Sequence, residues 1–357
     1  MDPRPPPSQR SPAPTLGTID TRDNGFDTVR LLAAAAVLVS HAFALTAFAE
    51  PLEDLGRGVS LGTMAVGAFF VISGLLITIS AERSGTGQFL RQRARRLMPA
   101  LFVCVIVCVA VGALVTRLPA GEYWTSLQTL GFLGNAVFLP LSQALPGVFA
   151  SQPNGAANGS LWTLPFEVAC YAISFAFARL RFGRHALLLV AWFASIVLSR
   201  HFSGDEDGVW FFVERTAWLF RFYGAGMLLY AFRDRIPLRA DWALAALALL
   251  ALSPVIGVFA EAAATLGAYA LIAAAYRAPR WFRAVTARGD ISYGVYLYAF
   301  PIQQLLVPLS LKTPVPWLTN PALALPLTIL AGVTSWLLVE RRFLARKSDR
   351  TAAAHAF

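Results

Sequence analysis

Residues 29–49 read VRLLAAAAVLVSHAFALTAFA, an apolar run that carries two ionisable side chains, Arg30 and His41. At 1.5 Å per residue, a helix of this length extends about 31 Å, which matches the ~30 Å hydrocarbon core of a bilayer. The whole chain has the same character, since 57% of its 357 residues are apolar and 14% are charged. Soluble domains have about 25% charged residues. The composition therefore predicts an all-α, polytopic helical membrane protein, and excludes a disordered chain, a disulfide scaffold and an ordinary cytosolic enzyme.

Ten segments are apolar enough to be predicted as transmembrane helices. They are residues 29–49, 60–80, 97–116, 162–179, 186–202, 209–231, 242–259, 262–276, 290–310 and 322–340. Around them we predict three regions. Residues 1–24 are proline-rich and predict a disordered cytoplasmic tail rather than a signal peptide. Residues 25–341 form the membrane domain, and residues 342–357 form a basic cytoplasmic tail.

The basic residues orient these helices. Of the 30 lysines and arginines, 24 fall in clusters on one side of the predicted bundle, and the positive-inside rule makes that side cytoplasmic. Both termini are therefore predicted to be cytoplasmic. The opposite loops carry the acidic residues Glu50, Glu53, Asp54, Asp205, Glu206 and Asp207. This arrangement accounts for the net charge of +10 without any role in binding nucleic acid.

One further apolar segment, residues 127–141, is broken by Gly131, Gly134 and Pro140. If it crossed the membrane, every later basic cluster would face outward, against the positive-inside rule. We therefore predict a re-entrant or interfacial segment on the outer side.

Arg30 and His41 are eleven residues apart on the first predicted span. Eleven steps of about 100° make three turns and about 20°, so both side chains share one helix face. The rise of about 16 Å puts Arg30 at the cytoplasmic rim and His41 near the midplane. Asp27 is placed to pair with Arg30. Ionisable groups within spans indicate function, but a histidine that packs between helices and bonds across the bundle is an alternative.

Residues 160–167 read SLWTLPFE, with a tryptophan typical of an interfacial anchor and a proline typical of a first helical turn. Glu167 would then lie about 8 Å deep from the outer side, at a depth near that of His41. A carboxylate there could fix the imidazole tautomer and raise its basicity, as general-base catalysis requires. The alternative is a structural ion pair of Glu167 with Arg215 or Arg221.

Five arginines lie between residues 83 and 96, just before the third predicted span. Arg93 and Arg96 are three residues apart, so they share one face of a helix. Guanidinium forks suit the phosphates of a nucleotide or of CoA. The alternative is that these cations only anchor the topology or contact anionic lipid.

Other reactive residue types carry weaker signals. The three cysteines, Cys104, Cys108 and Cys170, lie in apolar runs, which argues against disulfides and indicates packing. Three histidines, His185, His201 and His355, lie in loops or near the end of the chain, where solvated side chains are expected. Residues 158–160, Asn-Gly-Ser, match a glycosylation acceptor, but that pattern is short and frequent. No metal-ligand pattern is visible, so we expect no metal.

Five motifs in order resemble those of the membrane acyltransferase 3 family. They are FDTVR at 26–30 with its Arg-x10-His spacing to His41, FFVISGL at 69–75, RARRLMP at 93–99, SLWTLPFE at 160–167 and ISYGVYLY at 291–298. The likeness extends from residue 26 to about residue 340. One departure stands out, because the family commonly has a histidine just after the last motif, where this chain has Ala299.

The resemblance implies an enzyme that acylates, most often O-acetylates, glycans and related molecules. It implies acyl-CoA, usually acetyl-CoA, as cytosolic donor, with Arg30, Arg93 and Arg96 near the CoA end. His41 is then expected at the reaction centre, as general base or as nucleophile, with Glu167 orienting it or positioning the acceptor. The expected acceptor is a carbohydrate or a lipid-linked glycan. The alanine- and arginine-rich composition is typical of a GC-rich bacterium, so we expect the cell inner (plasma) membrane.

A transporter or flippase of a lipid-linked saccharide is the competing class of protein. Ten helices, midplane charges and a span interrupted at Pro301 would suit it. The transporter interpretation, however, does not explain why an arginine cluster and a histidine lie along one path.

Overall fold

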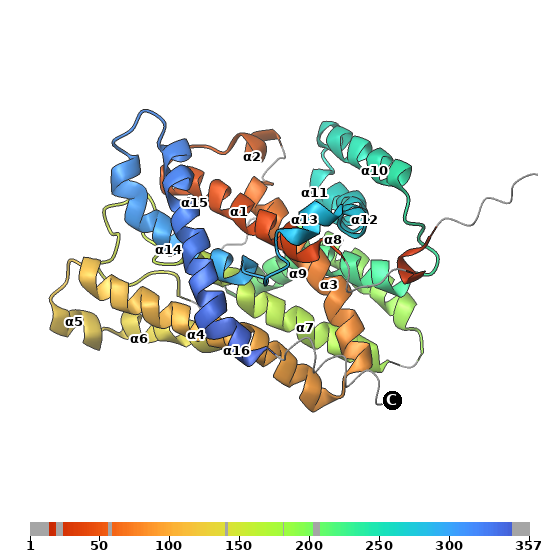
Figure 1. Ribbon diagram of the computed structural model, residues 1–357, viewed down its shortest axis with the longest axis horizontal. Coiled ribbons are helices and arrows are strands. Elements are labelled where there is room, and N and C mark those ends of the chain that lie inside the picture. Colours follow the sequence, from red (N-terminus) through yellow and green to blue (C-terminus); the bar gives the residue numbers. More distant parts are fainter. Residues whose placement is uncertain are drawn as a thin grey trace, which may run out of the picture.

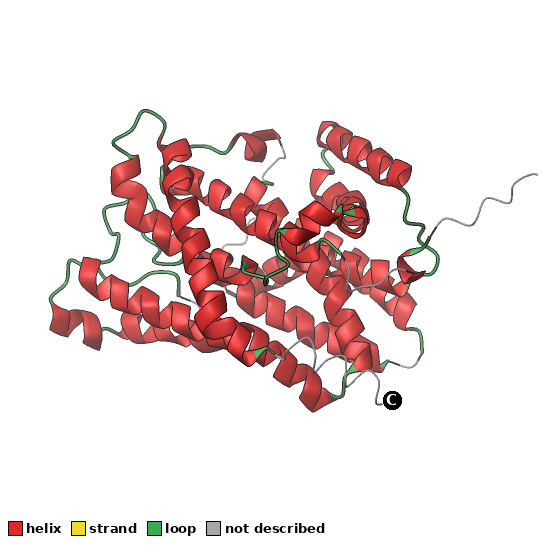
Figure 2. Ribbon diagram, in the orientation of Figure 1, coloured by secondary structure: helices red, strands yellow, loops and turns green. Residues whose placement is uncertain are grey.

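The computed structural model describes residues 14–18, 24–55, 59–139, 142–180, 182–202 and 208–344. Every regular element within these ranges is a helix (Figure 2), which confirms the all-α prediction. Most of the two predicted tails and the acidic residues Asp205, Glu206 and Asp207 lie outside the described residues, as does His355.

The first half of the chain forms α1 (Phe26–Leu45), α2 (Pro51–Leu55), α3 (Leu61–Arg83), α4 (Thr86–Val115), α5 (Ala120–Thr125), α6 (Leu127–Leu133) and α7 (Leu164–Arg179). The second half forms α8 (Arg184–His201), α9 (Gly208–Ala231), α10 (Ala240–Leu252), α11 (Phe259–Ala262), α12 (Ala268–Arg277), α13 (Arg280–Ala284), α14 (Ser292–Ser310), α15 (Pro316–Ser335) and α16 (Arg341–Phe343). Short 3-10 helices are η1 (Leu16–Thr18), η2 (Gly134–Val137), η3 (Gly159–Thr163) and η4 (Ser253–Ile256), and π-helical turns are η5 (Ala263–Gly267) and η6 (Trp336–Glu340).

Six helical segments are long and apolar enough to cross a membrane. They are Phe26–Leu45, Leu61–Arg83, Thr86–Val115, Gly159–Arg179, Phe259–Arg277 and Pro316–Phe343, and each overlaps a predicted span. The other four predicted spans correspond to α8, α9, α14 and the shorter apolar segment Ala240–Ile256. Of these, α9 carries three charged residues, Glu214, Arg215 and Arg221. The structure thus confirms a bundle of apolar helices, while the count of ten and the side of the termini remain predictions.

The segment that we expected to be re-entrant is folded as two short pieces. Helix α6 has only seven residues and is followed directly by η2, so residues 127–139 do not form one membrane-crossing helix. They lie beside α4 (Figure 1), where Phe132 is fully buried.

Helix α3 is the central element of the bundle and packs against α1, α7 and α9 (Figure 1). Its closest approach is to α9, through one glycine on each helix. A Cβ atom on Gly74 would meet the carbonyl oxygen of Tyr223, and one on Gly226 would meet that of Val71. Small residues at helix crossings let backbones touch and gain packing energy in an apolar bundle. The glycine in the FFVISGL motif is therefore explained by helix packing.

Helices α14 and α15 form a second packed pair that also contacts α1. A buried polar network joins them: Gln303 Nε2 donates to the Leu38 carbonyl (2.8 Å) and to Asn320 Oδ1 (2.9 Å), and Asn320 Nδ2 donates to the Gln303 carbonyl (3.1 Å). Interhelical amide hydrogen bonds of this kind fix the register of apolar helices. They hold the second half of α14 against α1 at Leu38, one turn before His41.

We predict that Gly74→Ala destabilises the protein by about 1–3 kcal/mol, because the added methyl group forces α3 away from α9. The measurement is the apparent melting temperature of the purified protein in detergent. Gly87→Ala is the matched control, since a Cβ atom at Gly87 has no other atom within 4 Å. Equal melting temperatures for the two variants would contradict the proposed packing.

Candidate active site

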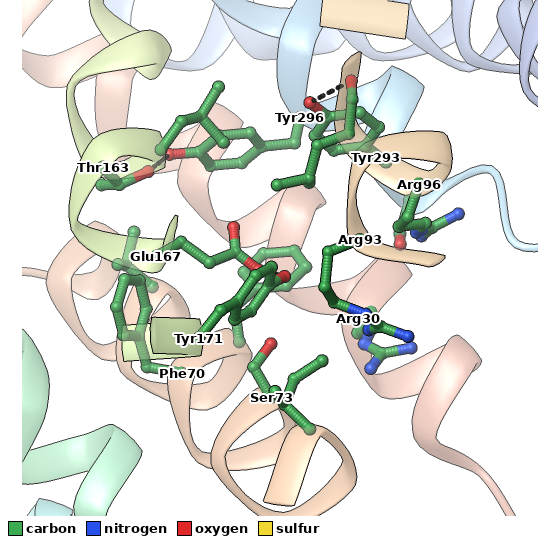
Figure 3. A pocket seen from close by; sticks show the side chains of 16 residues that line it. Arg30, Phe70, Ser73, Arg93, Arg96, Thr163, Glu167, Tyr171, Tyr293 and Tyr296 are labelled. Atoms are coloured by element: carbon green, nitrogen blue, oxygen red, sulfur yellow. Dashed lines mark hydrogen bonds between the residues drawn. The ribbon is translucent and has the colours of Figure 1, made fainter. Parts of the chain in front are cut away.

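A cavity lies between α1, α3, α4, α7 and α14, with about 670 Å³ of empty space that includes its opening to solvent. Four predicted site residues line it: Arg30, Arg93, Arg96 and Glu167. The remaining lining is mostly apolar and aromatic, and consists of Val66, Phe69, Phe70, Ser73, Ile77, Leu97, Thr163, Leu164, Tyr171, Ser292, Tyr293 and Tyr296. In Figure 3 the three arginines lie on one side of the cavity, with Glu167 and Thr163 on the other. The motifs at 26–30, 69–75, 93–99, 160–167 and 291–298 thus converge on one site.

Two of the arginines are held by carboxylates. Arg30 Nη1 lies 3.2 Å from Asp27 Oδ1, which confirms the predicted pair, and 3.8 Å from Asp290 Oδ2. Arg96 Nη2 lies 2.5 Å from the same Asp290 oxygen, and its Nη1 lies 3.5 Å from Glu340 Oε2. These ion pairs join α1 and α4 to the start of α14 and to η6.

Asp290 is a central residue of the site that the sequence analysis did not single out. Its other oxygen, Oδ1, accepts hydrogen bonds from the backbone N–H (3.0 Å) and the hydroxyl (2.5 Å) of Ser292, at the first turn of α14. Asp290 therefore satisfies the first backbone N–H of α14 and pairs with Arg96 at the same time. The sequence does show an acidic residue directly before the ISYGVYLY motif.

Arg93 differs from the other two arginines because no carboxylate in the described part of the chain lies within 4 Å of it. Its guanidinium lies 5.9 Å from the ring centroids of both Phe89 and Tyr171, and its buried Nε has no hydrogen-bond partner. Its neighbours on the same helix, Arg91 and Arg95, are exposed. The predicted shared face of Arg93 and Arg96 is therefore the one that lines the cavity. A guanidinium with unused donors there is suited to an anionic ligand.

Glu167 lies in the first turn of α7, across the cavity from the arginines, and accepts a short hydrogen bond from Tyr171 Oη one turn further on. The alternative ion pairs are not formed, because Arg215 pairs with Glu214 (3.2 Å) and Arg221 with Glu261 (3.5 Å). Tyr171 is a second residue that the sequence analysis missed, although the Glu-x3-Tyr spacing places both side chains on one helix face.

His41 is not among the described residues that line the cavity. Its ring packs edge-on against Phe300 of α14, with 5.0 Å between centroids and an interplanar angle of 80°. Its buried Nδ1 has no hydrogen-bond partner, and no hydrogen bond among the described residues joins it to Glu167. The structure thus brings Glu167 to the arginine cavity and leaves His41 further along α1, against α14.

The other residues of reactive types are either buried in the helix packing or exposed on the surface. All three cysteines are buried and free. His185 and His201 are exposed, as expected, but they lie in the first and last turns of α8 rather than in loops. Asn158 of the glycosylation-like motif is fully buried. Within the described residues no group of three His, Cys, Asp or Glu side chains could hold a metal ion.

The chain is thus an apolar helical bundle around a cavity with an arginine wall and an opposing carboxylate. Comparison with known proteins identifies the family. The family model described as an acyltransferase domain, that of acyltransferase family 3, matches residues 23–340. The chain therefore belongs to this family and is an acyltransferase.

Three similar proteins span nearly the whole chain. The chain is 34% identical over 348 residues to the "O-acetyl transferase" of Shigella phage Sf6, which covers 92% of this chain and 98% of that protein. It is 28% identical to "Nodulation protein 10" of Rhizobium leguminosarum bv. viciae over 92% of this chain and 95% of that protein. It is also 28% identical to "Exopolysaccharide production protein ExoZ" of Rhizobium meliloti over 85% of this chain and 96% of that protein. No solved structure matches.

We predict that Asp290→Asn lowers the stability of the protein by about 2–4 kcal/mol, because it leaves the largely buried Arg96 with a weaker partner. The measurement is again the apparent melting temperature in detergent. Asp241→Asn is the matched control: it removes an ion pair with Arg239 in which both side chains are about half exposed or more, and such pairs contribute about 0–1 kcal/mol. A loss no larger for Asp290→Asn than for Asp241→Asn would show that the Asp290 pair does not hold the bundle together.

Proposed function

We propose that this protein is a membrane O-acyltransferase that moves an acyl group, most simply acetyl, from acyl-CoA to a hydroxyl group of a carbohydrate or lipid-linked glycan. The observation that carries the proposal is the arginine-walled cavity formed by all five family motifs. The similarity to an O-acetyl transferase supports acetyl as the group, and the similarity to an exopolysaccharide production protein supports a carbohydrate acceptor. We place it as a multi-pass protein in the cell inner (plasma) membrane.

The donor site in this proposal is the arginine wall. Arg93 would bind a CoA phosphate directly, because its donors are unused. Arg96 and Arg30 would add charge from positions fixed by Asp290 and Asp27. CoA phosphates carry several negative charges, and Arg forks bind phosphates by charge-assisted hydrogen bonds.

A continuous set of contacts leads from the cavity toward His41. Thr163 Oγ1, which lines the cavity, lies 2.7 Å from Tyr296 Oη of α14. One helical turn along α14, Phe300 packs against Gly159 of η3 and against the ring of His41. The path along α1 from Arg30 to His41 is about 16 Å, a distance of the order of an extended pantetheine arm. By length alone, a CoA held at the arginines would present its thioester near the imidazole once the side chains around Phe300 admit the pantetheine arm.

His41 is the proposed reaction centre. Acting as general base, it would take the proton of the acceptor hydroxyl while the hydroxyl oxygen attacks the thioester carbonyl; the C–S bond then breaks and CoA leaves as the thiol after protonation. Acting as nucleophile, it would first carry the acyl group itself. The contact of Glu167 with Tyr171 supports a role in holding substrate in the cavity rather than in orienting His41.

We predict that His41→Ala lowers turnover of radiolabelled acetyl-CoA by at least about 100-fold in the purified protein, the usual range for loss of a general base. The assay counts both hydrolysis and transfer. His201→Ala, at the exposed end of α8, is the control and retains full turnover. Full activity of His41→Ala would overturn the proposed reaction centre. No turnover and no CoA binding by the folded wild-type protein would overturn the proposed function and favour a flippase.

We predict that Arg93→Ala raises the KM for acetyl-CoA about tenfold or more, since losing one charge-assisted phosphate contact costs about 1.4 kcal/mol or more. Arg91→Ala changes it less than about twofold, because Arg91 is exposed on the other face of the same helix. Arg93→Lys restores part of the affinity by keeping the charge. Equal effects of the two alanine variants would instead support a role of the whole arginine run in anchoring the topology.

A further inference from the structure

Pro301 interrupts the hydrogen bonding of α14 beside the proposed active site. A proline has no backbone N–H, so the carbonyl group four residues earlier, that of Leu297, has no partner within the helix. Leu297 is fully buried. A buried carbonyl group without a partner is costly, and an apolar bundle offers no water to supply one.

Asn158 supplies the missing donor. Its Nδ2 lies 3.0 Å from the Leu297 carbonyl oxygen, and the thiol of Cys104 on α4 makes a longer contact to the same oxygen (3.5 Å). The other end of the same amide is also used, because Asn158 Oδ1 accepts the backbone N–H of Ser160 at 3.0 Å and so caps η3. One buried side chain therefore satisfies the interrupted turn of α14 and starts the SLWTLPFE segment.

The segment that Asn158 starts makes two contacts with α14 at the proposed site. Gly159 packs against Phe300, which in turn packs against His41, and Thr163 bonds to Tyr296. The same segment then continues without a break into α7 and Glu167. Its position relative to α14 thus depends on the Asn158 amide at its beginning.

We propose that Asn158 is a positioning residue for acyl transfer: its amide replaces the hydrogen bond that Pro301 removes, and so fixes residues 159–167 against α14. The inference rests on the proposed function, because it concerns the geometry of that reaction's site. It also assigns the Asn-Gly-Ser motif a structural role. A fully buried amide with both ends hydrogen-bonded is not accessible for glycosylation.

The test is a double-mutant cycle between residues 158 and 301. Asn158→Ala alone is expected to lower kcat for acyl transfer about tenfold or more, because the buried Leu297 carbonyl then keeps only the weak thiol donor of Cys104. The KM for acetyl-CoA should change less than about twofold, since the arginines lie on α1 and α4. In the Pro301→Ala background, residue 301 regains its N–H and can bond to Leu297, so Asn158→Ala should cost at least about threefold less than it does with Pro301. The cost that remains is that of the lost cap on Ser160.

Pro308→Ala is the matched control, because it restores an N–H in the same helix toward Gln304, a carbonyl that Asn158 does not contact. In that background Asn158→Ala should keep its full tenfold effect. The same cycle is read a second time from apparent melting temperatures in detergent, which do not depend on acyl transfer. The inference would be overturned if Asn158→Ala lowered kcat and the melting temperature equally in the wild-type and Pro301→Ala backgrounds. A wild-type protein without turnover would overturn the proposed function, while the melting cycle would still decide the role of Asn158.

Discussion

The ion pairs of Arg96 hold together segments that are far apart in the chain. Its guanidinium contacts Asp290 before α14 and Glu340 in η6, from a position on α4. Buried charges are stable in an apolar bundle only when they are paired, so these contacts decide how α4, α14 and α15 meet. Because Asp290 and Glu340 are engaged with Arg96, Arg93 on the same helix face is left with unused donors. The structural pair and the proposed ligand site thus arise from one cluster.

The features that could be predicted from the sequence are those that depend on local spacing along a helix. The shared face of Arg93 and Arg96 and the pair of Arg30 with Asp27 follow from helix periodicity and were confirmed. The partners of Arg96 could not be predicted, because they lie 194 residues away at Asp290 and further still at Glu340. Residues 209–231 were predicted as a span although they carry three charges, and α9 covers them. The interhelical partner of the buried Arg221 is Glu261, 40 residues away, and could not be predicted.

The positions of His41 and Glu167 show a second limit of sequence reasoning. Depth estimates put both residues near the same level, yet equal depth does not make two side chains neighbours. Which of them meet depends on how α1, α7 and α14 are rotated, and no local pattern encodes that rotation. The structure turns Glu167 to Tyr171 and the arginines, and turns His41 to Phe300. Tertiary packing therefore separates two residues that sequence reasoning had paired.

Ala299 stands where the family commonly has a histidine, so this chain has no imidazole at that position. It is fully buried with Leu38 and Ala324 in an apolar cluster between α1, α14 and α15. The three buried side chains of this cluster are small or apolar, and the Gln303–Asn320 network lies one turn further along α14. His185 and His201 are exposed and lie at the ends of α8. Among the described residues, His41 is therefore the one imidazole in the core of the bundle that can take up or release a proton. Any second acid or base there must be a carboxyl, phenol or thiol group.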